Sequence, residues 1–248
     1  MNKNMNKEKM KNLLFLDVEA TGLTEEDRLV QVAYDFEGVE KEAMFNPGRD
    51  MEIEAMEVTH ITDKDLKDKE TFQGSDFYNE LKGVLEKDET IFVAHNAPYD
   101  IGMIEREEIK VGKSIDTYKI AQALDVKSKI PAFRLQYLRY YLGLEVEDVV
   151  AHDALGDVRV LKAVFERMYD KMIEGDTHDE VIAKMIKITS EPMLIKRLTF
   201  GKHRGELVAD VARSDRGWLE WLLSQKESDA ANGDIDEDWI YTLKHYLR

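Results

Sequence analysis

The chain has 248 residues, of which 43% are hydrophobic and 35% are charged, and its formal net charge is −16. This length suits one catalytic domain with a smaller appendage. The absence of cysteine excludes disulfides, thiolate metal ligands and cysteine nucleophiles, and it is typical of the cytoplasm, where we expect the protein to reside. No apolar run approaches the roughly 18 residues that a membrane span requires, so we expect no membrane association.

The strong acidity restricts how the chain can bind nucleic acid. Phosphate contacts normally come from Lys and Arg, so a net charge of −16 disfavours a protein that holds nucleic acid on a broadly basic surface. An enzyme whose carboxylates hold divalent cations is not disfavoured, because the cations then supply the positive charge.

Hydrophobic patterning predicts strands first and helices later. Residues 1–12 are expected to form a flexible basic leader, because they carry four lysines and the apolar run after them is too short for an export signal. A continuous apolar run at 13–18 indicates a central strand, followed by more exposed strands at 29–36 and 39–45. The pattern then predicts a helix at 75–85, a strand at 91–94 and helices at 99–107, 117–124, 134–142 and 154–173. This order predicts an α/β fold with a mixed sheet flanked by helices.

A polar segment after the last of these helices suggests a domain boundary. Residues 175–192 are predicted to form a linker with one short helix near 179–187. The chain is therefore predicted to contain a catalytic domain at 13–174 and a small C-terminal module at 193–248.

Two acidic residues end the first predicted strand. Asp17 and Glu19 are two positions apart, so their side chains point to the same face of a strand. Carboxylates on a buried strand are costly unless they are paired or bind a metal. The alternative is an ordinary solvated strand end, and the pair alone does not decide between them.

Two later segments carry similar residues. In HNAPYD, which starts at His95, Asp100 is expected in the first turn of a helix. An acidic residue there can also simply stabilise the helix through its interaction with the helix dipole. In HDALGDV, Asp153 is the expected N-cap, so His152 lies in the preceding loop and Asp157 in the first turns. A lone histidine is more often an ordinary surface residue, and His152 gains significance only from its neighbours.

Taken together, these segments supply four carboxylates and one histidine. Oxygen ligands without cysteine favour Mg²⁺ or Mn²⁺ over Zn²⁺. Two such ions about 3.5–4 Å apart can activate a water and stabilise the leaving oxygen in phosphodiester cleavage. The sequence therefore predicts a site for two divalent ions and a general base. Its residues are Asp17, Glu19, Asp100, Asp157 and His152.

The ordered motifs Asp17-x-Glu19, His95-Asn96-Ala97-x-x-Asp100 and His152-x4-Asp157 resemble the histidine-containing branch of the DEDD exonuclease superfamily. That branch includes the proofreading epsilon subunit of the bacterial replicative polymerase, ribonuclease T and oligoribonuclease. The resemblance covers roughly residues 13–170. It implies a ribonuclease H-like fold and a 3′→5′ exonuclease that releases nucleoside monophosphates.

The resemblance also implies roles for individual residues. Asp17, Glu19 and Asp157 are expected to bind the first ion, and Asp17 is expected to bridge to a second ion that Asp100 helps to hold. His152 is expected to be the general base. The pocket for the terminal nucleotide is expected to comprise Ala20, Thr21, Gly22, Leu23, His95, Asn96 and Tyr99, of which Ala20 and Tyr99 depart from the usual Thr and Phe.

The C-terminal region carries a second resemblance. Residues 200–211 and 215–223 resemble the small C-terminal module of exodeoxyribonuclease X-like proteins. Residues 193–226 contain seven Lys or Arg and four acidic residues, a net charge of +3. Lys202, His203 and Arg204 are therefore candidate contacts for nucleic-acid phosphates, whereas Trp218 and Trp221 favour core packing over base stacking.

Several alternatives stay open. The appended module favours DNA as substrate, as a single strand or at 3′ ends, with RNA as the alternative, because discrimination at the 2′ position depends on pocket shape. A non-catalytic nucleic-acid-binding subunit is less favoured, because every position expected to hold a metal ligand carries a carboxylate residue. Association with a polymerase or repair complex, and homodimer formation, are compatible with the sequence and are not decided by it.

Overall fold

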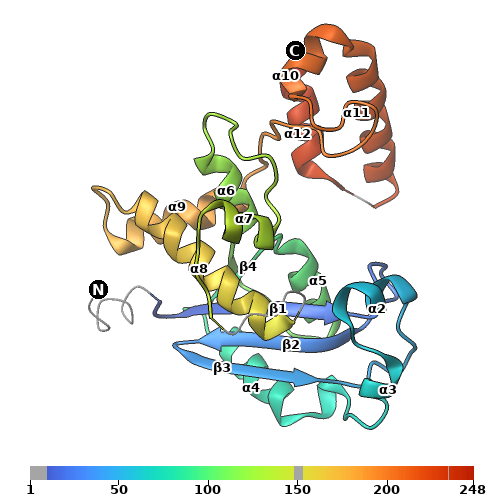
Figure 1. Ribbon diagram of the computed structural model, residues 1–248, viewed down its shortest axis with the longest axis vertical. Coiled ribbons are helices and arrows are strands. Elements are labelled where there is room, and N and C mark those ends of the chain that lie inside the picture. Colours follow the sequence, from blue (N-terminus) through green and yellow to red (C-terminus); the bar gives the residue numbers. More distant parts are fainter. Residues whose placement is uncertain (1–9, 148–152, 234) are drawn as a thin grey trace. The chain divides into compact units, whose positions relative to one another are not determined.

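The computed structural model describes residues 10–147, 153–233 and 235–248, and the chain divides into two compact units (Figure 1). Unit 1 contains the chain up to Tyr118 and Phe133–Ile186, whereas unit 2 contains Lys119–Ala132 and Lys187–Arg248. This division does not coincide with the predicted boundaries at 174 and 192, since residues 119–132 join the C-terminal segment. The role of residues 193–248 as a separate module stays a prediction.

A five-stranded mixed sheet forms the centre of unit 1. Strand β1 runs antiparallel to β2 and parallel to β4. The apolar run at the start of β1 is fully buried, as expected for a central strand. The predicted mixed sheet flanked by helices is confirmed. Across the sheet the order is β3 (Val39–Met44), β2 (Leu29–Phe36), β1 (Leu13–Ala20), β4 (Ile91–Ala94) and β5 (Lys113–Asp116).

Up to residue 190, the six predicted helices lie within three residues of their predicted bounds, whereas three further helical segments were not predicted. Helices up to residue 190 are α2 (Ile53–Thr59), α3 (Asp63–Leu66), the 3₁₀ helix η1 (Phe72–Gly74), α4 (Asp76–Leu85), α5 (Pro98–Arg106), α6 (Thr117–Leu124), α7 (Leu135–Tyr141), α8 (Ala154–Met172) and α9 (His178–Ser190).

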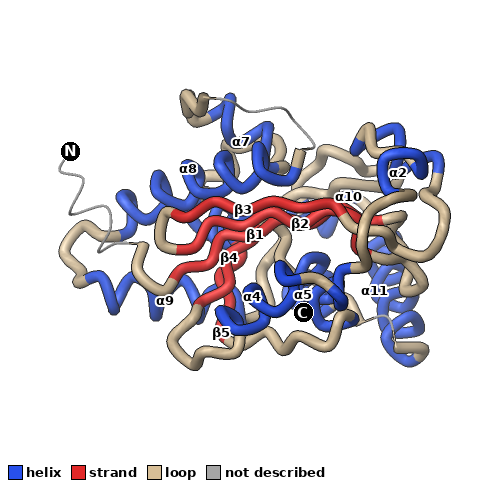
Figure 2. Tube along the Cα trace, turned by 90° about the horizontal axis from the view of Figure 1, so that it is seen from below, coloured by secondary structure: helices blue, strands red, loops and turns tan. Residues whose placement is uncertain are grey.

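Helices cover both faces of the sheet. Helix α8 packs on one face, and α4 and α5 lie on the other (Figure 2). Because side chains alternate along a strand, β1 contributes to both layers. Leu14 and Leu16 join the core that includes Leu81 of α4, whereas the Phe15 ring lies 5.2 Å from that of Phe165 on α8, between centroids. The odd-numbered residues of β1 therefore face α8.

Unit 2 packs its helices around a separate apolar core. Leu219 and Leu243 are fully buried in it, and Trp218 packs against it. The expectation of core packing therefore holds for Trp218, whereas Trp221 is 54% exposed. Within the described ranges of the chain, no helix has the length and apolar character needed to cross a membrane. The C-terminal helices are α10 (Val208–Ser214), α11 (Arg216–Ala231) and α12 (Glu237–Tyr246).

Candidate active site

Asp17 and Glu19 lie on the face of β1 that packs against α8, because they continue the odd-numbered series of Phe15. The register of β1 against β2 shifts between Glu19 and Ala20. Such an irregularity re-aims the side chains next to it. Strand β1 thus ends with two carboxylates on one face, as the sequence predicts, and this face packs against α8.

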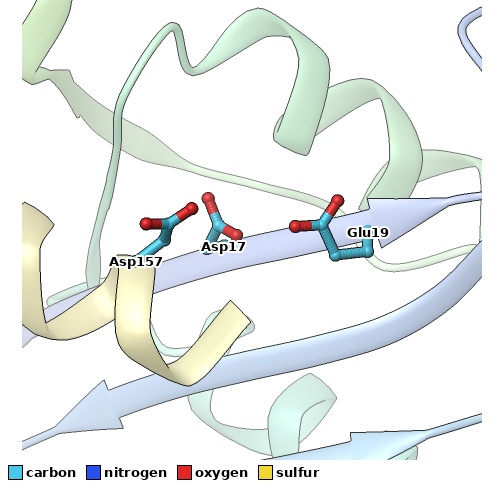
Figure 3. Close-up of side chains that lie close together, drawn as sticks. All are labelled: Asp17, Glu19 and Asp157. Carbon is cyan, nitrogen blue, oxygen red and sulfur yellow. The ribbon is translucent and has the colours of Figure 1, made fainter. Parts of the chain in front are cut away.

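Asp157 completes a group of three carboxylates. It lies in the first turn of α8, whose predicted N-cap, Asp153, accepts a hydrogen bond from the Gly156 N–H at 3.2 Å. One oxygen from each of Asp17, Glu19 and Asp157 lies within 4.8 Å of the others (Figure 3). The packing of α8 on β1 therefore brings together three acidic residues that the sequence holds far apart.

Burial and mutual repulsion raise the pKa values of the strand carboxylates. Burial raises the pKa of Glu19 to about 8, and the charges of Asp157 and Asp153 add to the shift. The pKa of Asp17 is raised well above its usual value, first by burial and then by Asp100 and Glu19. The leading causes of both shifts are burial and neighbouring carboxylates, and none of these causes is a cationic side chain. Without a bound cation, the site therefore favours protonated carboxyl groups.

The donor set suits a hard divalent cation. Mg²⁺ and Mn²⁺ prefer carboxylate oxygens, and three such oxygens within 4.8 Å of one another can hold one ion. A cation at this position would offset the repulsion that raises the pKa values of Asp17 and Glu19. Both ions fit this donor set equally.

Asp100 borders the group of three without belonging to it. It lies in the first turn of α5, as predicted, and is 5% exposed. Its Oδ1 accepts a hydrogen bond from the Val18 N–H at 3.2 Å, which ties the start of α5 to β1 between the two acidic residues of the strand. Burial raises the pKa of Asp100 well above its usual value. Its expected role at a second ion stays a prediction.

Gln136 contacts the site and was not identified from the sequence. Its Nε2 donates a hydrogen bond to Oδ1 of Asp157 at 2.5 Å. The contact depends on the packing of α7 against α8, which no local pattern in the sequence reveals. Gln136 therefore orients the helix-borne carboxylate of the group.

Four of the seven residues of the predicted nucleotide pocket lie at the end of β1 and in the loop that follows it. Ala20 and Thr21 are buried, and the Thr21 hydroxyl donates to Oδ1 of Asp27 at 2.6 Å, so it stabilises the loop from within. Leu23 is 85% exposed at the same loop. Of these residues, Leu23 is therefore the side chain free to contact a ligand.

Gly22 and Tyr99 fix the position of this loop. A Cβ atom on Gly22 would lie 2.8 Å from the carboxyl carbon of Glu52, so a larger residue does not fit there without rearrangement. The Tyr99 hydroxyl donates to the Gly22 carbonyl oxygen at 3.1 Å. Tyr99 thus links α5 to the loop that presents Leu23.

His95 and Asn96 contact protein groups in this structure. The ring nitrogens of His95 lie 2.8 Å from Oγ1 of Thr117 and 2.6 Å from the Phe133 carbonyl oxygen. Burial lowers the pKa of His95 to about 4, so the ring is neutral at neutral pH. Asn96 has a positive φ of 65°, and its N–H donates to Oδ1 of Asp116 at 2.9 Å. Both residues stabilise the region where β4, β5 and α5 meet. Their contacts with substrate stay predictions.

The remaining predicted residues are His152 and the C-terminal loop. His152 lies outside the described residues, so its role as general base stays a prediction. In unit 2, Nζ of Lys202 lies 2.6 Å from Oδ2 of Asp215, and Nε2 of His203 lies 2.9 Å from the same oxygen. Arg204 is exposed, and its side chain forms no ion pair within the part of the chain that is described. The loop therefore presents fewer unpaired cations than its composition suggests.

Comparison with known proteins agrees with this geometry. The exonuclease family model (RNase_T) matches residues 14–165. Exodeoxyribonuclease 10 of Escherichia coli K12 is 29% identical over 211 residues, which cover 82% of this chain and 83% of that protein. The DNA polymerase III subunit epsilon of Treponema pallidum is 34% identical over 166 residues, which cover 61% of this chain and 74% of that protein.

A solved structure of exonuclease X in complex with 5′ overhanging duplex DNA matches with a TM-score of 0.57 and 23% identity. The match covers 72% of this chain and 99% of that one, and it confirms the ribonuclease H-like fold. Since the family model extends over more than half of the chain, and the three carboxylates lie together within the matched region, the chain belongs to the exonuclease family and is a 3′→5′ exonuclease of the DEDD superfamily.

Proposed function

We propose that this enzyme is a divalent-metal-dependent exonuclease that hydrolyses DNA from its 3′ ends and releases nucleoside monophosphates. The observation that carries the proposal is the convergence of Asp17, Glu19 and Asp157, with one oxygen of each within 4.8 Å of the others. These residues would hold Mg²⁺ or Mn²⁺, which would supply activation of the attacking water and stabilisation of charge on the phosphate.

The side chains of this chain have distinct tasks in the proposal. Asp17, Glu19 and Asp157 supply oxygen ligands, and Gln136 keeps the Asp157 carboxylate oriented by its hydrogen bond. Asp100, held by the Val18 N–H, is proposed to help hold a second ion. Removal of the proton from the attacking water is assigned to His152, which directly precedes the N-cap of α8 in the sequence.

The proposed substrate is DNA. Support comes from similar proteins, which are an exodeoxyribonuclease and a DNA polymerase subunit, and from a fold neighbour that binds duplex DNA with a 5′ overhang. The polymerase relative also supports association with a polymerase or repair complex as a secondary proposal. RNA is the alternative substrate, because discrimination at the 2′ position depends on the shape of the pocket for the terminal nucleotide.

One assay tests metal dependence, polarity and substrate together. The purified full chain is incubated with a 5′-labelled single strand of DNA, the same strand in a duplex, and an RNA of the same sequence. We expect a ladder of products that shorten from the 3′ end, loss of activity with EDTA, and recovery with Mg²⁺ or Mn²⁺. A covalently closed single-stranded circle is the control, because it has no 3′ end.

Two outcomes would contradict the proposal. Cleavage of the closed circle would show endonuclease activity, and activity that survives chelation would exclude the metal-dependent mechanism. Faster hydrolysis of RNA than of DNA would replace the substrate assignment while leaving the mechanism in place.

A further inference from the structure

The longest acid-free stretch of the chain includes the helix that contacts the active site. No Asp or Glu occurs between Asp125 and Glu145, although the chain holds 51 acidic residues. A polyanion meets the least repulsion where a strongly acidic protein lacks carboxylates. Of its four cations, Arg134 and Arg139 lie in unit 1 with α7, whereas Lys127 and Lys129 belong to unit 2.

Helix α7 lies within this stretch and has one buried and one exposed face. Leu138 is fully buried on the side that packs towards α8. Tyr137, Tyr140 and Tyr141 share another face, because residues three and four positions apart are neighbours on a helix. Tyr140 is 75% exposed and Tyr141 is 47% exposed. Helix α7 therefore presents aromatic rings to solvent.

The rings on this face contact one another and adjoin positive charge. Tyr137 and Tyr141 are stacked, with 6.1 Å between centroids and 20° between ring planes. The Arg139 guanidinium lies 5.4 Å from the centroid of the Tyr140 ring. Arg134, the N-cap residue of α7, is exposed. Flat rings beside guanidinium groups are the usual means of binding single-stranded nucleic acid without sequence preference.

This face is continuous with the active site. Gln136 donates to Asp157, so the first turn of α7 lies at the three carboxylates. With a rise of about 1.5 Å per residue, Tyr140 lies about 6 Å further along the helix axis. A strand whose 3′ end reaches the carboxylates can therefore extend along α7.

We propose that Arg134, Tyr137, Tyr140 and Tyr141, here termed the α7 platform, bind the single strand whose 3′ end is hydrolysed. The tyrosine rings stack on bases and Arg134 contacts a phosphate. The platform rests on the proposed function, because it specifies how the same site holds its substrate. The lack of acidic residues and the continuity with the carboxylates favour a nucleic-acid strand over a second copy of the chain as occupant.

The test uses the full chain and two substrates of different size. One is a long 5′-labelled single strand, and the other is the p-nitrophenyl ester of thymidine 5′-monophosphate, which fills only the terminal site. Tyr140→Ala is the test variant, because a side chain that is 75% exposed can be truncated without disturbing the core. Tyr140→Phe is the matched control, because stacking requires the ring and not the hydroxyl.

The platform predicts a selective loss of strand binding. Tyr140→Ala should raise KM for the long strand by about fivefold or more, as expected for the loss of one base–aromatic stack. Hydrolysis of the small ester should be unchanged, and Tyr140→Phe should behave like the wild type. Arg134→Gln should reduce the slope of log affinity against log salt concentration by about 0.7, the value for one phosphate contact with a single strand.

Other outcomes overturn the platform. They are an unchanged KM for Tyr140→Ala, an equal effect of Tyr140→Phe, or an equal loss on the small ester. A change of oligomeric state with unchanged KM would identify a second copy of the chain as the occupant. If the wild type hydrolyses neither substrate, the proposed function fails separately, and strand affinity by fluorescence anisotropy then decides: equal affinity of wild type and Tyr140→Ala overturns the platform.

Discussion

At Glu19, proton binding, metal binding and stability are linked. Its pKa is raised from 4.5 to about 8 in the folded chain, mainly by burial. Between these values the metal-free folded state holds a proton that the unfolded state has released, so the free energy of unfolding falls as pH rises through this window. We expect Glu19→Gln to raise the Tm of the metal-free protein at about pH 8 and to flatten the decline of Tm from about pH 5 upwards.

Differential scanning fluorimetry in EDTA measures both effects. Glu54→Gln, which changes an exposed residue on α2, is the control and should keep the wild-type profile. Added Mg²⁺ should raise the Tm of the wild type more than that of Glu19→Gln, because the metal replaces the proton at this carboxylate. Identical pH profiles of wild type and Glu19→Gln would show that Glu19 does not retain a proton.

Gln136 should affect metal affinity more than catalysis at saturating metal. Its hydrogen bond orients Asp157, and loss of such outer contacts to metal ligands typically weakens metal binding about 10–100-fold. We expect Gln136→Ala to raise the Mn²⁺ concentration required for half-maximal activity within this range. At saturating Mn²⁺ the turnover number should approach that of the wild type. A lower turnover number with unchanged Mn²⁺ dependence would argue against an orienting role.

His152 should show the opposite behaviour. A general base typically contributes about 10²–10⁴ to the rate, so His152→Ala should lose turnover by this factor. Metal affinity, measured by isothermal titration calorimetry with Mn²⁺, should be unchanged. An equal loss of metal affinity would identify His152 as a ligand.

At the scale of elements, those with strong apolar patterns could be predicted from the sequence. The start of β1 is a continuous apolar run, and α8 combines an N-cap at Asp153 with many buried apolar residues at helical spacing. Strand β5 could not be predicted, because Ile115 is its one apolar residue and its strand conformation depends on pairing with β4. Helices α2 and α3 are likewise too short for a periodic pattern.

The same distinction applies to the site. The carboxylates of β1 could be placed on one face from strand alternation alone, and Asp157 from its position after an N-cap. Gln136 could not be placed, because its contact with Asp157 crosses between two helices. The hydrogen bonds that Thr21 and His95 form with other protein groups could not be predicted either, because a sequence does not show which polar side chains stabilise the fold.

One of the contacts that hold the loop after β1 comes from the Tyr99 hydroxyl and can be removed without loss of the ring. Tyr99→Phe deletes the hydrogen bond to the Gly22 carbonyl and keeps the ring, at a typical cost of about 0.5–1.5 kcal/mol. If the bond positions Leu23 for substrate, Tyr99→Phe should raise KM about two- to tenfold and should change the turnover number less. Steady-state kinetics on a single strand measures this. An unchanged KM would show that the packing around Gly22 suffices to hold the loop.

At the scale of the whole molecule, most cations of the C-terminal region already have partners within unit 2. Composition gives residues 193–226 a net charge of +3, but it does not show how the charges pair. Lys196 donates to the carbonyl oxygens of Gln122 and Asp125. Four of the remaining cations lie in ion pairs, which are Lys202–Asp215, Arg213–Asp210, Arg216–Glu220 and Lys226–Asp236.

This pairing changes how a role of the C-terminal loop in binding nucleic acid should be tested. Deletion of residues 193–248 would leave residues 119–132 without the rest of their compact unit, so point variants are preferable. Arg204→Ala should reduce the slope of log affinity against log salt by about 0.7 if Arg204 contacts one phosphate of a single strand. Lys202→Ala should have a smaller effect, because Lys202 must first leave Asp215, although an exposed pair of this kind contributes only about 0–1 kcal/mol.

Arg213→Ala is the matched control, since Arg213 is exposed and paired with Asp210 outside the loop. Its slope of log affinity against log salt should equal that of the wild type.

The competing interpretation is that the loop serves packing and stability. A Cβ on Gly201 would lie 2.8 Å from the Trp218 ring, and the centroids of the His203 and Trp218 rings are 5.1 Å apart. That interpretation predicts an unchanged slope in the Lys202→Ala/Arg204→Ala double variant, together with a lower Tm or an altered oligomer size. Salt titrations by fluorescence anisotropy, combined with melting curves of the same variants, therefore separate phosphate binding from packing.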